Sequence, residues 1–101
     1  MIYEMRTYTL RPGAVPDFEA QFAKALPHRE KYSRLGAFWH TEIGPLNQVI
    51  HVWPYDDLAH REQVRAAAVQ GGKWPPATQE LIVSMESEIL LPAPFMHPME
   101  P

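Results

Sequence analysis

The sequence predicts one α+β domain in which four strands form an antiparallel sheet and two helices cover one side of it. Three observations support this prediction. The hydrophobic period switches between strand and helix in the order β-α-β-β-α-β, two aromatic-rich segments flank a central Gly-Pro turn, and 101 residues suffice for one two-layer core. This is the order of the ferredoxin-like plait, with sheet order 4-1-3-2 and both helices on one face.

The first half of the chain supplies a strand and a helix. Residues 2–10 alternate between polar and apolar side chains and end at a Pro-Gly turn, which predicts the first strand. From Val15 the apolar spacing becomes helical. Pro27 should kink or restart this helix, which we expect to continue toward Gly36.

Residues 36–55 predict a β-hairpin around the turn tetrad 44–47, because proline at the second turn position favours chain reversal. With an even number of residues in the connection, we expect the cross-strand pairs Glu42 with Val49, His40 with His51 and Phe38 with Trp53. A bulge at Asn47 would instead place Trp39 and Thr41 on the shared face.

The second half repeats the helix and strand. Asp56 and Asp57 should cap a helix that ends at Gly71-Gly72, a short helical turn is expected at 78–81, and residues 83–91 predict the fourth strand. We therefore expect a domain at residues 1–91 and a proline-rich tail at residues 92–101 that lies across a surface of this chain or of a partner.

Composition excludes several classes of function. The net charge is −3 with scattered basic residues, which argues against a nucleic-acid partner. There is no apolar run of about 18 residues, so we expect no membrane-spanning helix. Without cysteine there is no disulfide and no thiolate chemistry. The first residues do not resemble a signal peptide, and a cytoplasmic location is the expectation.

The alternation along each strand predicts which side chains point toward the helices. The others point to the opposite face of the sheet, the bare side, which no helix covers. In the fourth strand, Met85 and Ile89 should meet the helices; in the third, Ile50 and Val52; in the first, Tyr3 and Met5. The bare face would then hold Glu86, Glu88, Glu4, Arg6, Tyr8, His51, Trp53, Tyr55, Phe38, His40 and Glu42. So many exposed rings would be costly, so we expect a second copy of the chain to cover this face.

The titratable residues of that face are candidates for catalysis. His51 could act as a general base near neutral pH, tuned by Glu4 or Glu42, while Arg6 and Tyr8 stabilise negative charge. Alternatively, His51 is an interface histidine, and Glu4 with Arg6 is a buried ion pair that fixes the strand register. The expected substrate-binding residues are Trp53, Phe38, His40, Tyr55 and Glu42.

Metal binding is the weaker interpretation of the same histidines. His40, His51 and Glu42 offer nitrogen and oxygen donors, but their spacing matches no diagnostic metal motif. The face is acidic and offers one arginine, which argues against haem. We therefore expect no metal and no cofactor.

Three stretches together resemble the NIPSNAP family of the dimeric α/β-barrel superfamily: IYEMRTYTLRPGAVPDF at 2–18, GAFWHTEIGPLNQVIHVWPYDDLAHREQVRAA at 36–67 and ILLPAPF at 89–95. The resemblance implies a homodimer in which two plaits press their bare faces together, with a pocket between sheet and helices or within the barrel. Related barrel families include cofactor-free monooxygenases, haem degraders, dehydratases and decarboxylases, so it does not fix the chemistry.

We therefore expect a small, cofactor-independent, homodimeric enzyme. It would act by acid-base chemistry on a small apolar or aromatic organic molecule, in a bacterial biosynthetic or catabolic pathway. The alternative is a non-catalytic NIPSNAP module that binds a ligand or a partner protein through the pocket or the tail.

Overall fold

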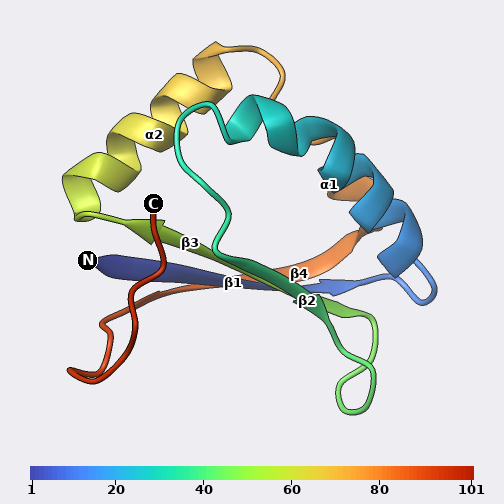
Figure 1. Ribbon diagram of the computed structural model, residues 1–101. Helices are drawn as coiled ribbons and strands as arrows, with labels where there is room; N and C mark the ends of the chain where they lie inside the picture. Colours follow the sequence, from blue (N-terminus) through green and yellow to red (C-terminus); the bar gives the residue numbers. More distant parts are fainter.

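One antiparallel sheet with two helices on the same side forms the protein (Figure 1). The computed structural model describes all residues 1–101. The sheet order is β2-β3-β1-β4, which confirms the predicted ferredoxin-like plait. In chain order the elements are β1 (Ile2–Leu10), α1 (Val15–Arg29), β2 (Ala37–His40), β3 (Gln48–Tyr55), α2 (Leu58–Gln70), a 3₁₀ turn (Gln79–Leu81) and β4 (Ile82–Leu90).

Helix α1 begins as predicted, with a proline in its first turn, but it ends earlier than expected. It runs past Pro27 and stops at Arg29, so the predicted continuation toward Gly36 is wrong. The Arg29 guanidinium turns inward and donates to the carbonyl and hydroxyl oxygens of Ser33. These contacts hold the chain in the turn that follows the helix.

Helix α2 has the predicted boundaries. The carboxylate of Asp57 accepts a hydrogen bond from the backbone N–H of His60 at 2.8 Å, which satisfies one of the free donors at the helix start. The helix ends at Gln70, immediately before Gly71 and Gly72.

The hairpin between β2 and β3 has a longer connection than predicted. Its pairs are Phe38 with His51 and His40 with Val49, so the expected register is wrong by two residues. Seven residues, Thr41 to Asn47, connect the strands, and Asn47 takes a left-handed conformation with φ 59°. The shift is even, so Phe38 and His40 still share a face with His51, and Trp39 lies on the opposite face.

The predicted facing of β1 and β3 is wrong, whereas that of β4 is confirmed. Tyr8 pairs with Met85, so the two side chains share a side, and the Tyr8 ring packs edge-on against Phe18 of α1 at 5.9 Å, which makes it the helix-covered side. On β1 and β3 that side carries Glu4, Arg6, Tyr8, His51, Trp53 and Tyr55, and Phe38 on β2 joins them. The bare side carries Tyr3, Met5, Ile50, Val52, Glu86 and Glu88.

Both sides of the central strands carry apolar residues, which is why alternation alone did not reveal the side that meets the helices. The main core lies between sheet and helices and is built from Leu10, Ala14, Phe18, Phe22, Val49, Trp53, Tyr55 and Val64. Burying the larger aromatic rings of this side removes more apolar area from water than burying Ile50 and Val52 would. Neither helix combines the length and the hydrophobicity needed to cross a membrane.

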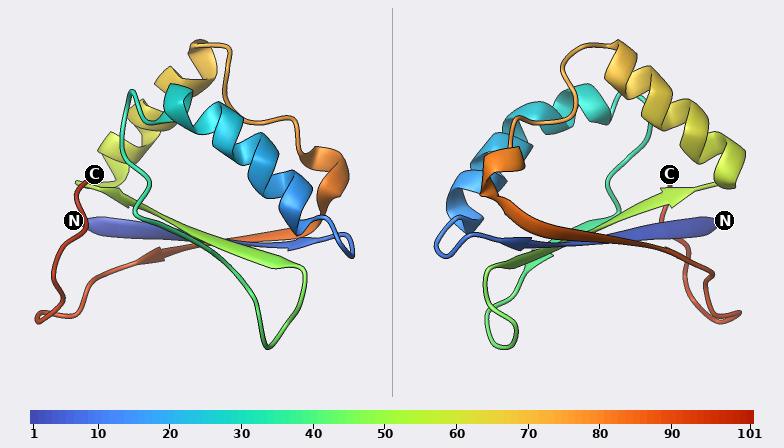
Figure 2. Two further views of the ribbon diagram at one scale, coloured as in Figure 1. Left: turned by 45° about the vertical axis from the view of Figure 1, so that its right-hand side comes forward. Right: turned by 180° about the vertical axis from the view of Figure 1, so that it is seen from behind.

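The tail folds back along the bare side of the sheet (Figure 2). The backbone N–H of Met99 donates to the Tyr3 hydroxyl at 3.2 Å, and the Met99 sulfur lies close to Gly36. Tyr3 is consequently buried. The tail thus contacts this chain, which is one of the two placements that the sequence allowed.

Candidate functional site

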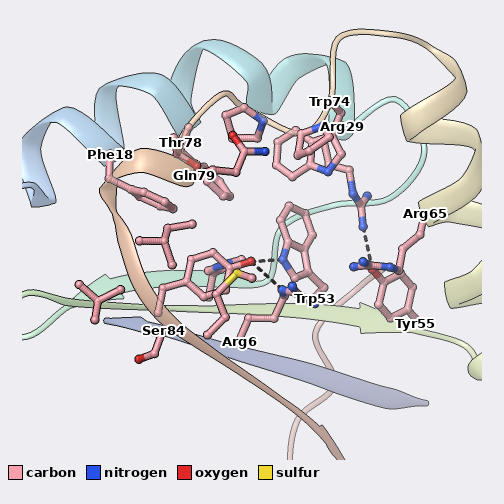
Figure 3. Close-up of a pocket in the computed structure, with 18 residues that line it drawn as sticks. Arg6, Phe18, Arg29, Trp53, Tyr55, Arg65, Trp74, Thr78, Gln79 and Ser84 are labelled. Carbon is pink, nitrogen blue, oxygen red and sulfur yellow. Dashed lines mark hydrogen bonds between the residues drawn. The ribbon is translucent and has the colours of Figure 1, made fainter. Parts of the chain in front are cut away.

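A pocket of about 590 Å³ lies between the helix-covered side of the sheet and α1 (Figure 3). The segment between α2 and β4 contributes Trp74, Pro75 and Pro76 to its wall. The remaining lining residues are Arg6, Tyr8, Phe18, Phe22, Arg29, His51, Trp53, Tyr55, Arg65, Thr78, Gln79, Ile82, Val83, Ser84 and Met85.

Arg6 and Tyr8 form the polar floor of the pocket, and both come from β1. The Arg6 Nε–H donates to the Tyr8 hydroxyl oxygen at 2.8 Å, and Nη1 donates to Glu4 at 2.9 Å. Burial opposes the charge of Arg6, but its bonds to Tyr8 and Glu4 outweigh burial and raise its pKa. Because the Tyr8 oxygen accepts from Arg6, its own hydrogen is free to reach a ligand.

Glu4 lies beneath this floor and does not border the pocket. It is fully buried, and its two carboxylate oxygens accept from Arg6, from Arg61 of α2 at 3.0 Å and from the Ser87 hydroxyl of β4. Burial would raise the pKa of Glu4, but the hydrogen bonds and nearby guanidinium groups lower it to about 2. Glu4 therefore joins β1, α2 and β4 as an ionised structural group, as the ion-pair alternative predicted.

The His51 ring accepts one hydrogen bond in this structure and is neutral. The Trp53 indole N–H can only donate, and it donates to His51 Nδ1 at 2.7 Å, so the proton of the neutral ring resides on Nε2. Burial, helped by the charge of Arg6, lowers the pKa of His51 to about 3. This arrangement disfavours the expected general base near neutral pH, since Nδ1 accepts from Trp53 and Nε2 already carries a proton, and the catalytic role of His51 stays a prediction.

The Nε2 atom of His51 is buried and has no hydrogen-bond partner. Buried polar atoms without partners are uncommon in native structures and cost about 1–3 kcal/mol. His51 is 2 % exposed, and its ring borders the pocket. A ligand oxygen is the natural acceptor for this N–H.

Aromatic rings form the apolar walls. The Phe22 ring lies edge-on to Trp74 and His51, with ring centres 5.5 and 5.3 Å apart, and Trp53 packs against Trp74 at 6.0 Å. Phe38 stacks on His51 at 5.5 Å from outside the pocket. Phe38 thus supports the site without lining it, which corrects its expected role in substrate binding.

Two arginines at the other end of the pocket were missed at the level of sequence. Arg29 of α1 is 2 % exposed and donates to the Tyr55 hydroxyl at 2.7 Å, while its guanidinium lies 4.3 Å from the centre of the Trp53 ring. Arg65 of α2 is half-exposed beside it (Figure 3). A basic residue in an amphipathic helix usually faces solvent, so the sequence pattern gives no signal for either.

His40 and Glu42 lie outside the pocket. His40 Nδ1 contacts the Glu19 carboxylate of α1 at 2.8 Å on the protein surface, and this contact raises the pKa of His40. Glu42 is exposed in the hairpin connection. The predicted grouping of His40, His51 and Glu42 is therefore wrong, and no three His, Cys, Asp or Glu side chains lie together as a metal site.

The fold and the pocket define a class: a ferredoxin-like α+β domain with a polar and aromatic cavity between sheet and helices. The sequence model of the NIPSNAP family matches residues 3–97. Protein NipSnap homolog 1 of Danio rerio is 37% identical over 94 residues, which are 90% of this chain and 34% of that protein. Protein NipSnap homolog 3A of Homo sapiens is 35% identical over 94% of this chain and 40% of its own length. The chain belongs to the NIPSNAP family.

Solved structures agree with this assignment. A NIPSNAP-like domain protein from Burkholderia xenovorans superimposes with a TM-score of 0.86 at 37% identity, covering 99% of this chain and 91% of that one. A NIPSNAP family protein of unknown function from Agrobacterium tumefaciens gives 0.88 at 31% identity, covering 98% and 93%. An antibiotic biosynthesis monooxygenase shares the fold alone, at 10% identity and a TM-score of 0.68, over 93% and 100% of the two chains. The chain spans about a third of the length of its animal relatives.

Proposed function

We propose that the chain is a small enzyme that acts without a cofactor on an apolar or aromatic organic molecule in the pocket beside α1. The observation that supports this most is the buried Nε2–H of His51, which has no partner in the protein. A donor in a desolvated wall is suited to an oxygen atom that gains negative charge during a reaction. The surrounding aromatic rings offer an apolar surface against which the apolar or aromatic body of the substrate can pack.

His51 and the floor residues Arg6 and Tyr8 suggest a division of roles that differs from the one expected from the sequence, in which His51 was the general base. His51 would donate a hydrogen bond to the reacting oxygen, and Tyr8 would give it a proton. Arg6, held by Tyr8 and Glu4 at 2.8 and 2.9 Å, would stabilise the developing charge. Glu4 would act only by fixing and balancing Arg6, which makes it a positioning residue.

A search for turnover tests the enzymatic role. The purified protein is incubated with a mixture of small aromatic ketones, phenols and enols, and consumption of each compound is followed by mass spectrometry. For a compound that is consumed, His51→Phe should reduce the rate at least 100-fold, because it removes the donor but keeps an aromatic ring in the wall. His40→Ala, outside the pocket, is the matched control. Equal rates for His51→Phe and the unaltered protein would refute the proposal.

A binding module without catalysis is the second candidate, and the tail is the observation that favours it. Leu91 and Phe95 are 80% and 88% exposed, which is unusual for large apolar side chains. Deletion of residues 92–101 distinguishes the two candidates. If the deletion abolishes binding of a partner protein but leaves turnover of small molecules unchanged, the non-catalytic binding module is favoured.

The proposal also includes the homodimer expected from the sequence. Two observations support the homodimer. The bare side of the sheet carries Met5, Ile50 and a half-exposed Trp39. In addition, β4 is an edge strand whose residues are exposed along nearly its whole length. A cytoplasmic location, a bacterial biosynthetic or catabolic pathway, and the domain boundary at residue 91 stay predictions from the sequence.

A further inference from the structure

The lining of the pocket is positively charged although the chain as a whole is negatively charged. Arg6, Arg29 and Arg65 border the cavity, and no aspartate or glutamate does, whereas the net charge of the chain is −3. A cavity with low-dielectric walls and charges of one sign concentrates ligands of the opposite sign. The pocket is thus built for an anion.

Arg29 is the strongest sign of this preference. It is 2 % exposed, and its three hydrogen bonds all go to uncharged oxygens, those of Ser33 and Tyr55. No carboxylate lies within ion-pair distance of its guanidinium. Burying a charge without a counter-ion is costly, and proteins normally pair such groups.

Glu4, the one buried carboxylate nearby, does not supply the missing counter-charge. Its oxygens accept from Arg6 and Arg61 at 2.9 to 3.0 Å, and Arg65 approaches it only to 3.9 Å. One negative charge is therefore shared mainly by two other guanidinium groups. The end of the pocket that holds Arg29 and Arg65 retains an excess of positive charge.

We propose that the ligand of this pocket is an aromatic or apolar carboxylic acid, with its carboxylate between Arg29 and Arg65 and its body along Trp53 and Trp74. This inference rests on the proposed function, because it concerns the same pocket. It adds the substrate class: an organic acid whose reacting oxygen lies toward His51.

The structure favours a carboxylate over a phosphate ester. A planar guanidinium can form two parallel hydrogen bonds with either a carboxylate or a phosphate, so the preference depends on the rest of the site. Phosphate sites commonly use backbone amides at a helix N-terminus, but Val15, Pro16 and Asp17, which open α1, do not line this pocket, nor does any residue of the first turn of α2. Arg29 lies in the last turn of α1, where the helix dipole stabilises its positive charge and opposes a dianionic phosphate ester more strongly than a monoanionic carboxylate.

Thermal unfolding with three probes that share a naphthyl ring tests the inference: 2-naphthoate, its isosteric amide 2-naphthamide, and 2-naphthyl phosphate. Because a ligand stabilises the folded state by mass action, the melting temperature reports binding. We expect 2-naphthoate to raise it and the neutral amide to leave it unchanged. Equal stabilisation by the acid and the amide, or no stabilisation by the acid at millimolar concentration, would overturn the inference. So would stronger stabilisation by the phosphate.

Two variants of equal charge change locate the carboxylate. Arg65→Gln removes a half-exposed guanidinium and should weaken 2-naphthoate binding by about tenfold, the loss expected for one charge-assisted contact. Arg34→Gln, exposed and away from the pocket, should leave the affinity unchanged. Equal weakening in both variants would show a general effect of charge and refute the site.

The test is independent of catalysis. Selective binding of 2-naphthoate with no turnover of any compound would support the carboxylate site while the proposed enzyme fails. Turnover that depends on His51 but consumes neutral compounds as readily as acids would support the proposed enzyme while the carboxylate site fails. The two proposals can therefore fail separately.

Discussion

At the scale of single residues, the site depends on polar side chains that are buried with defined partners. Glu4 and Arg6 were recognisable from the sequence as a pair on one strand face, and their contact at 2.9 Å confirms it. Arg61 and Ser87, which complete the network, come from elements 57 and 83 residues away. Sequence spacing indicates pairs within a strand, whereas groups that meet only through packing leave no local pattern.

The stability of the fold should depend strongly on Glu4. Glu4→Gln keeps the shape of the side chain but leaves Arg6 and Arg61 without their shared counter-ion. We expect the free energy of unfolding, measured in urea, to fall by about 3 kcal/mol. Glu62→Gln is the matched control, because Glu62 contacts Arg61 from a largely exposed position and should change stability by less than about 0.5 kcal/mol. A small change for Glu4→Gln would contradict the assignment of this network.

The pH dependence of Glu4 follows from its lowered pKa. The group titrates at 4.5 when unperturbed and at about 2 in the folded chain. Its contribution is therefore complete above pH 4.5 and is lost as the pH falls from there through about 2. Between these limits, unfolding in urea should show a shallower loss of stability for Glu4→Gln than for the unaltered chain.

His51 should change the free energy of unfolding at a higher pH than Glu4 does, because the pKa of His51 is lowered from 6.5 to about 3. Below pH 6.5 the unfolded chain gains a proton that the folded chain excludes. Its contribution should therefore decrease by up to about 1.4 kcal/mol per pH unit as the pH falls. Comparing unfolding of His51→Gln with the unaltered chain between pH 6.5 and 5 isolates this slope. Parallel curves would mean that His51 is protonated in the folded chain.

At the scale of secondary structure, caps and turns determined where the elements lie, and packing determined which side of each strand is buried. β1 matches its predicted range of residues 2–10 because a Pro-Gly turn closes it. The facing of β1 and β3 was not predictable from alternation, since isoleucine and valine lie on one side and tryptophan, tyrosine and histidine on the other. Contacts with the helices resolve it, since Tyr8 of β1 packs against Phe18 of α1 and Trp53 of β3 lies in the core with Phe22.

The start of α2 offers a clean test at this scale. Asp57→Ala removes the carboxylate that accepts from the His60 N–H at 2.8 Å, and should lower the free energy of unfolding by about 1 kcal/mol. Asp56→Ala removes an equal charge one residue earlier but no capping bond, so it controls for the helix dipole. Urea unfolding of both variants measures the difference. Equal losses would show that charge alone stabilises the helix start.

At the scale of the whole molecule, the two sides of the sheet have separate tasks. The helix-covered side holds the pocket, and residues of one chain line it. The bare side is closed partly by the tail, through Tyr3 and Gly36, and leaves Trp39 54% exposed on β2. The family resemblance allowed a pocket on either side of the sheet, and the structure places five of the candidate residues on the helix-covered side, in the pocket: Arg6, Tyr8, His51, Trp53 and Tyr55.

The bare side should therefore be the dimer interface, and its disruption should leave the pocket intact. Sedimentation should give a particle of twice the 11.6 kDa chain mass for the unaltered protein and of a single chain for Trp39→Glu, because a buried unpaired charge at an interface is strongly unfavourable. Leu58→Glu, an equally exposed apolar residue on α2, should remain dimeric. Single-chain mass for the unaltered protein would refute the dimer. Unchanged stabilisation of Trp39→Glu by 2-naphthoate would show that each chain binds its ligand without the other.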